Sequence, residues 1–153
     1  MKYLMSINVA GVPATQHVCR ELAQFIINSY QIREVDVSHC RINFQGTRYI
    51  IDALNRNTTI RNFNFSHNDL SSESFEFSIK VASMITRHPS LLHLNISNTN
   101  LIRAEVLFIG LSLSISKSML SLHLTAGTLA YYERIFLKAV ISARTGWQFR
   151  NHV

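Results

Sequence analysis

The chain has 153 residues, of which 47% are hydrophobic and 16% charged. This balance supplies a buried core for one domain and excludes intrinsic disorder. Fifteen Lys and Arg against nine Asp and Glu give a formal net charge of +6, which is compatible with an acidic partner, a nucleic acid or a membrane surface. The basic residues are scattered singly, without the run that is typical of a nucleic-acid patch. We therefore assign residues 1–153 to a single domain.

Cysteine usage and hydropathy bear on the compartment. Two cysteines, Cys19 and Cys40, are too few for the disulfide framework of small secreted domains, so we expect a reducing, cytoplasmic setting. The N-terminal stretch MKYLMSINVAGVPA resembles a weak signal peptide, but the repeat described next accounts for the same residues. The most apolar window, residues 106–115, is far shorter than the roughly 20 residues that cross a bilayer, so we expect no membrane span.

A short alternating pattern recurs five times along the chain. Its copies begin at Leu4, Ile32, Ile60, Leu91 and Met119, so the starts are 28, 28, 31 and 28 residues apart. The first, fourth and sixth positions are apolar in every copy, as in IREVDVSHCRI and LLHLNISNTNL. Such alternation predicts a short strand with these three side chains buried. A fixed period predicts that the strands lie side by side in register.

The second half of each unit carries a helical pattern. Apolar residues at helical spacing predict one amphipathic helix per unit, with these inward residues: Leu22, Ala23 and Ile26; Ile50, Ile51 and Leu54; Val81, Ala82 and Ile85; Ile109, Gly110 and Leu113. The three additional residues of the third unit fall within SSESFEFSIK and predict a longer helix or a longer approach to it. We also expect a terminal helix and a short strand in residues 130–153.

The strand copies match the pattern L-x-x-L-x-L-x-x-N-x-L, with Cys40, Asn68 and Thr99 at the ninth position of the central copies. With units of about 28 residues, the chain resembles the ribonuclease-inhibitor-like subclass of leucine-rich-repeat proteins. Val12 and Gly127 depart from the pattern in the outer copies. The resemblance implies an α/β solenoid of about five repeats, curved, with parallel strands on the concave face and helices on the convex face. It also implies protein binding and inward ninth-position side chains that bond the turn.

The concave face is the first candidate binding surface. Residues between the buried positions form columns across the strands, and the candidates are Glu34, Asp36, Asn62, Asn64, His93, Asn95, Ser121 and His123. These columns contain no Lys or Arg, so we do not expect nucleic acid there.

Two further surfaces are candidates. Basic residues of the helical halves are Arg48, Arg56, Lys80, Arg87, Arg134 and Lys138. They form either a solvated convex face or a site for an acidic protein or RNA. The ends of a stack expose strand edges, so Leu4, Trp147 and Phe149 are end-interface candidates. Either partner proteins cover these ends, or Trp147 and Phe149 fold back as a cap; a fragment of a longer chain would show the same ends.

The sequence offers little for catalysis. His39 and His67 share one repeat position and predict stacked rings, while a metal site needs three or four ligands. We find no nucleophile elbow or P-loop and expect no enzyme, metal or cofactor. Our hypothesis is a protein-interaction or architectural module of a larger assembly, cytoskeletal or ciliary by analogy. The alternatives are an inhibitor or sensor that grips a ligand on its concave face, and an RNA-associated protein that uses the convex basic residues.

Overall fold

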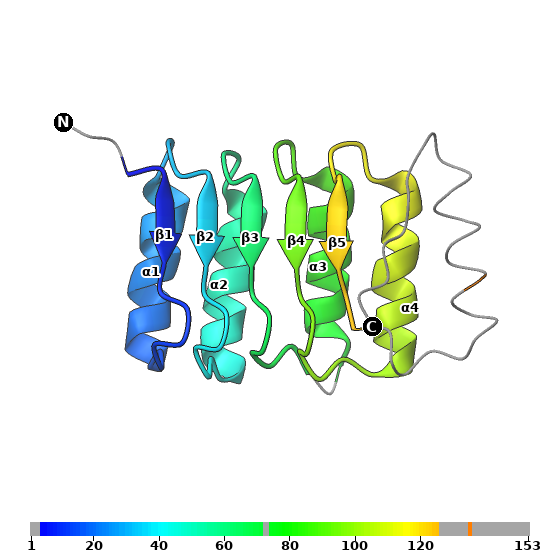
Figure 1. The fold of residues 1–153 in the computed structure, drawn as a ribbon, viewed down its shortest axis with the longest axis horizontal. Helices are drawn as coiled ribbons and strands as arrows, with labels where there is room; N and C mark the ends of the chain where they lie inside the picture. Colours follow the sequence, from blue (N-terminus) through cyan, green and yellow to red (C-terminus); the bar gives the residue numbers. More distant parts are fainter. Residues whose placement is uncertain (1–3, 72–73, 126–134, 136–153) are drawn as a thin grey trace.

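The computed structural model describes residues 4–71, 74–125 and 135 of the chain. Strands and helices alternate (Figure 1) in the order β1 (Ser6–Asn8), α1 (Gln16–Asn28), β2 (Glu34–Asp36), α2 (Phe44–Arg56), β3 (Asn62–Asn64), α3 (Glu76–Arg87), β4 (His93–Asn95), α4 (Arg103–Ser112), η1 (Leu113–Ile115) and β5 (Ser121–His123). The helix and strand expected in residues 130–153, together with Gly127, Arg134, Lys138, Trp147 and Phe149, lie outside the described residues.

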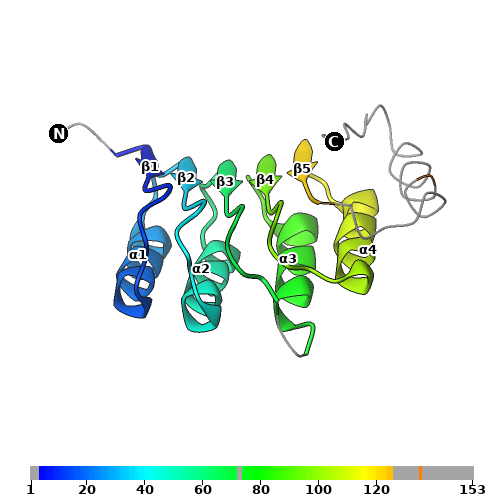
Figure 2. The ribbon, with the colours of Figure 1, turned by 60° about the horizontal axis from the view of Figure 1, so that its bottom comes forward.

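The five strands form one parallel sheet in the order β1-β2-β3-β4-β5. The fourth position of every strand copy lies in one row across the sheet, through Ile7, Val35, Phe63, Leu94 and Leu122. This confirms the predicted register and the mixed α/β class. Figure 2 shows the helices together on one side of the sheet, so the other face carries no helix of the described part.

The core lies between the sheet and the helices. Val35, Phe63 and Leu94 point from the strands toward the helices and are at most 1% exposed, while Ile50 and Ile85 meet them from α2 and α3 at 0%. Burying one such side chain stabilises the fold by about 1.5–3 kcal/mol. The apolar positions of the repeat therefore account for the packing of the central units.

Polar side chains fix where α1 and α2 begin. Thr15 Oγ1 accepts a hydrogen bond from Val18 N at 3.3 Å, and Asn43 Oδ1 accepts one from Gly46 N at 2.9 Å. Such caps satisfy amides that the first helical turn leaves unpaired. α3 has 12 residues against 13 in α2, so the additional residues of the third unit lie in its approach and not in a longer helix.

The ninth-position side chains bond the turns, as the sequence pattern implied. Asn68 Oδ1 accepts hydrogen bonds from Cys40 N and Ile42 N, both at 3.1 Å, and its Nδ2 donates to Val37 O at 2.7 Å. Cys40 Sγ donates to Val9 O at 3.1 Å. Asn68 thus joins the second and third units through buried backbone groups that have no access to water.

A second recurring device is a left-handed residue after the strand. His39, His67 and Asn98 have φ of 56°, 58° and 54°, and Gly11 takes 77° at the same position of the first unit. A left-handed conformation at a non-glycine residue costs about 1–2 kcal/mol, so the surrounding turn must hold it. The His39 and His67 rings stack with centroids 3.8 Å apart, which confirms the predicted stacking.

The turns from helix into strand use a third repeated position. Asn57 Oδ1 accepts from Thr59 N and Ile60 N, and in the next unit His88 Nδ1 accepts from Ser90 N and Leu91 N at 3.3 and 2.9 Å. His88 is buried, and its Nε2 has no hydrogen-bond partner. Burial lowers the pKa of His88, and the backbone of Asn57 opposes this only in part. The imidazole is therefore held neutral, with Nδ1 as the acceptor.

Replacing Asn68 by Ala should destabilise the domain by about 3 kcal/mol, because two buried amides lose their acceptor. Urea unfolding followed by circular dichroism measures this change. Asn28→Ala is the matched control, since Asn28 is exposed at the end of α1, and its change should stay within about 0.5 kcal/mol. Equal losses in the two variants would contradict the role given to Asn68.

His88 should also make stability depend on pH. Its folded-state pKa is lowered, so below the ordinary value of about 6.5 the unfolded chain binds a proton that the folded chain refuses. The stabilisation is complete above that value and is lost as the pH falls toward the folded pKa. The variant His88→Asn places at this position the residue that the previous unit has as Asn57. It should flatten the dependence of the free energy of unfolding on pH in this range, as measured by urea unfolding. Parallel profiles of the parent and the variant between neutral and mildly acidic pH would refute the assignment.

Candidate protein-interaction surfaces

The open face of the sheet is hollowed into a groove of about 310 Å³ lined by all five strands. Seven of the eight residues predicted for the concave face line it: Glu34, Asp36, Asn62, Asn64, His93, Asn95 and His123. Ser121 is the exception, although it lies in the row of Glu34, Asn62 and His93, and its Oγ is 3.1 Å from His123 Nε2. The register therefore brings the predicted columns together.

Hydrogen bonds between neighbouring strands order the groove. Asn62 Nδ2 donates to Glu34 Oε1 at 2.9 Å, and Asn64 Nδ2 donates to Asp36 Oδ2 at 3.0 Å. Asp36 Oδ1 accepts from both the amide and the hydroxyl of Ser38, at 2.9 and 2.7 Å. The side chains are thus held in place before any ligand arrives, which reduces the ordering cost of binding.

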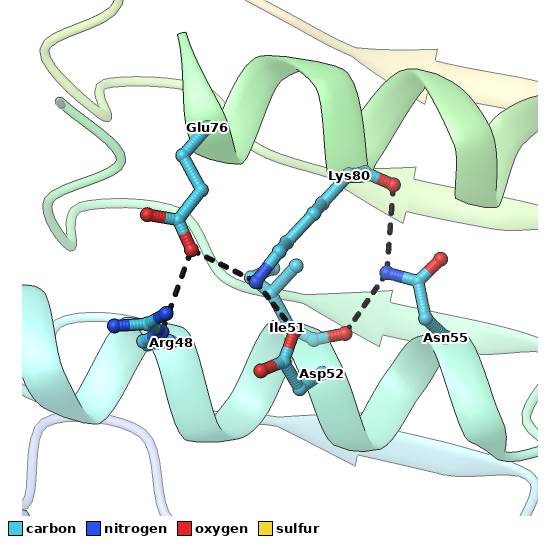
Figure 3. Close-up of polar contacts among 6 residues, drawn as sticks. All are labelled: Arg48, Ile51, Asp52, Asn55, Glu76 and Lys80. Atoms are coloured by element: carbon cyan, nitrogen blue, oxygen red, sulfur yellow. Dashed lines mark hydrogen bonds and ion pairs between the residues drawn. The ribbon is translucent and has the colours of Figure 1, made fainter. Parts of the chain in front are cut away.

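Two of the predicted basic residues lie in an ion-pair cluster on the outer surface of α2 and α3 (Figure 3). Lys80 Nζ lies 2.7 Å from Asp52 Oδ1 and 2.9 Å from Glu76 Oε1, and Arg48 Nε lies 3.4 Å from Glu76 Oε1. Burial lowers the pKa of Lys80, but the hydrogen bonds to the two carboxylates outweigh it and raise that pKa overall. Arg48 and Lys80 are thereby neutralised within the molecule, which weakens the case for a basic binding face.

The remaining basic candidates within the described residues lie at the C-terminal ends of helices. Arg56 and Arg87 are the last residues of α2 and α3, where a positive charge interacts favourably with the helix dipole. The structure therefore does not gather the predicted basic residues into one patch over the described part of the chain.

The first unit leaves apolar residues exposed at positions that the next units bury. Val18 and Phe25 of α1 are 49% and 40% exposed, whereas Gly46 and Ala53, 28 residues further on, are buried. A Cβ added at Gly46 of α2 would lie 2.8 Å from Cys19 Sγ of α1, so the side of α2 that carries Gly46 packs against α1. The corresponding Val18 and Phe25 of α1 form an apolar surface, which we call the α1 flank. The helix α1 stands at the end of the helix row in Figures 1 and 2.

The predicted end-interface residue Leu4 is likewise exposed, at 54%, so the expected burial of the first strand position is wrong for the first unit. The sequence analysis named Leu4 as an end-interface candidate and did not name Val18 or Phe25. The sequence did contain a signal for them, because both are large apolar residues that do not belong to the apolar positions predicted to face inward from their helix. They also stand where the second unit has Gly and Ala, so a helix could not pack on this flank as closely as α2 packs on α1.

The described residues also bear on metals and membranes. No group of three or more His, Cys, Asp and Glu side chains in this part of the chain could hold a metal ion. Among the same residues, no helix has the length and apolar character needed to cross a membrane.

Comparison with known proteins gives a fold but no family. No protein-family model matches the chain, and no curated protein matches it. A solved structure of leiomodin-1 actin-binding site 2 is similar with a TM-score of 0.74 and 15% identity, over 90% of this chain and 79% of that one. The tropomodulin C-terminal domain of Caenorhabditis elegans is similar with a TM-score of 0.71 and 14% identity, over 90% and 82%. The described chain therefore has the fold of these domains.

The expected membership of the ribonuclease-inhibitor-like leucine-rich-repeat proteins is wrong, because the structural neighbours are the tropomodulin and leiomodin domains. The physical reason is that apolar spacing reports only the packing of a unit on its neighbours. Apolar residues at a regular spacing indicate which side chains of strands and helices are buried, and not which family a chain belongs to. The pattern predicts the register and leaves the family open.

Replacing Lys80 by Met keeps most of the side chain's apolar length and removes the charge that holds Asp52 and Glu76. We expect a loss of about 0.5–1 kcal/mol at low salt that shrinks at high salt, because the pairs are partly exposed and screened. Thermal unfolding at the two salt concentrations measures it. Lys117→Met is the control, since Lys117 is exposed and the change in net charge is the same. A loss in Lys80→Met no larger than in this control would contradict the cluster's contribution.

Proposed function

We propose that this chain is a non-enzymatic, cytoplasmic protein-interaction domain of the cytoskeleton and that it binds actin. The supporting observation is the likeness, over 90% of the chain, to a leiomodin-1 domain described as an actin-binding site. We further propose that residues 1–153 form one domain in which the units stack as a curved solenoid.

The α1 flank is the surface through which we propose that actin binds. Val18 and Phe25 are exposed where the next units bury the same positions, and Leu4, two residues before β1, is exposed as well. Exposed apolar side chains on one face of a protein are typical of protein interfaces. An aromatic residue within such a patch is a common anchor of binding energy. A partner on this flank would cover the end of the stack.

A second candidate function is that of an inhibitor or sensor that holds a ligand on the open face of the sheet. The observation that favours it is the ordered groove around Asp36, Asn64 and Asn95. Association with RNA has no such support, since Arg48 and Lys80 are engaged with carboxylates.

The double variant Val18→Thr and Phe25→Gln tests the proposal. Both side chains are exposed, so thermal unfolding should change little, whereas affinity for actin should fall about tenfold or more if Phe25 is an anchor. Co-sedimentation with filaments and pyrene-actin elongation assays measure binding to filament sides and ends, and fluorescence titration measures binding to monomers.

The matched control carries Ile79→Thr and Phe108→Gln, at exposed positions of α3 and α4. It should bind actin as the parent chain does. The actin proposal is refuted if the unmodified chain binds neither actin monomers nor the sides or ends of actin filaments. Equal losses of affinity for actin in the two double variants would show that the α1 flank is not the binding surface.

A further inference from the structure

We propose that the groove on the open face of the sheet binds an extended segment of a partner protein that carries a Lys or Arg side chain, seated between Glu34 and Asp36. These residues are the two ends of β2. Side chains two residues apart in a strand point to the same face, so both carboxylates face the groove that they line. The inference concerns a different surface from the α1 flank and does not depend on actin.

The charge of the groove selects a cation. Glu34 and Asp36 are the charged groups among its lining residues, which include no Lys or Arg, in a chain whose net charge is +6. The ion pairs of the described residues engage Glu21, Asp52 and Glu76 and leave these two carboxylates without a cationic partner. A phosphate group or an acidic peptide would be repelled, whereas a basic side chain supplies the missing opposite charge.

The neighbouring contacts keep these charges aimed into the groove. Asp36 is held through both oxygens by Ser38 and Asn64, and Glu34 is held through one oxygen by Asn62. All of these donors are neutral, so they orient the carboxylates without cancelling their charge. A basic side chain would therefore meet preorganised acceptors.

The shape of the groove selects an extended chain. Five strands at a spacing of about 4.8 Å extend over roughly 19 Å, which about six residues of extended peptide cover. The lining beyond β2 consists largely of amide, hydroxyl and imidazole groups, with Asn62, Asn64 and Asn95 in the register rows. Such groups pair with peptide N–H and C=O groups. The occupant is thus a short polar strand with its basic residue over β2.

The probe is a positional-scanning set of acetylated and amidated hexapeptide mixtures, each with one defined residue, applied to the immobilised chain. At one or more positions, mixtures defined as Arg or Lys should bind about tenfold better than those defined as Glu, the size expected for two partly screened charge pairs. The preference should weaken with added salt.

The variant Glu34→Gln with Asp36→Asn should abolish the preference. Gln keeps the acceptor for Asn62, and Asn already occupies the Asp36 position in other units as Asn64 and Asn95, so the fold should be retained, as urea unfolding will check. Glu21→Gln removes an exposed carboxylate of α1 that does not line the groove and should leave the preference unchanged. The inference is overturned if no mixture binds, if basic residues are not preferred, if the preference survives in the double variant, or if Glu21→Gln removes it too.

Discussion

The structure depends on the in-register packing of each strand and helix against the next unit. The row from Ile7 to Leu122 crosses the sheet without a shift, and the buried apolar side chains of the central units are completed by atoms of a neighbour. Each unit therefore depends on contacts with its neighbour for part of its burial. The same rule explains why the first unit, with a neighbour on one side in the described chain, exposes Val18 and Phe25.

Packing also divides the molecule into two chemically distinct faces. The helices cover one side of the sheet, where Lys80 and Arg48 are balanced by carboxylates. The other side is polar and hollowed, and its carboxylates Glu34 and Asp36 have no cationic partner among the described residues. A protein that is basic overall thus presents an acidic groove, so its net charge does not indicate what that groove binds.

Much of this arrangement could be predicted from the sequence, because equivalent positions of successive units carry buried apolar side chains. Three apolar positions per unit predicted the register, and the ninth position predicted the turn bonds of Cys40 and Asn68. The ion pair of Asp52 with Lys80 was not predicted. The two residues are one repeat period of 28 residues apart, but whether their side chains meet depends on the conformers that they adopt between the two helices. The family could not be predicted, because the apolar spacing follows from packing that unrelated stacks share.

Asn57 shows how this construction restricts chemical modification. It stands in the sequence Asn-Thr-Thr, which is an acceptor for N-linked glycans, yet it is 3% exposed. Its Nδ2 already donates to Ile26 O at 2.8 Å and to Ser29 O at 3.2 Å. A sugar attached to that nitrogen would separate the first unit from the second, so the folded domain and an oligosaccharide at this asparagine are mutually exclusive.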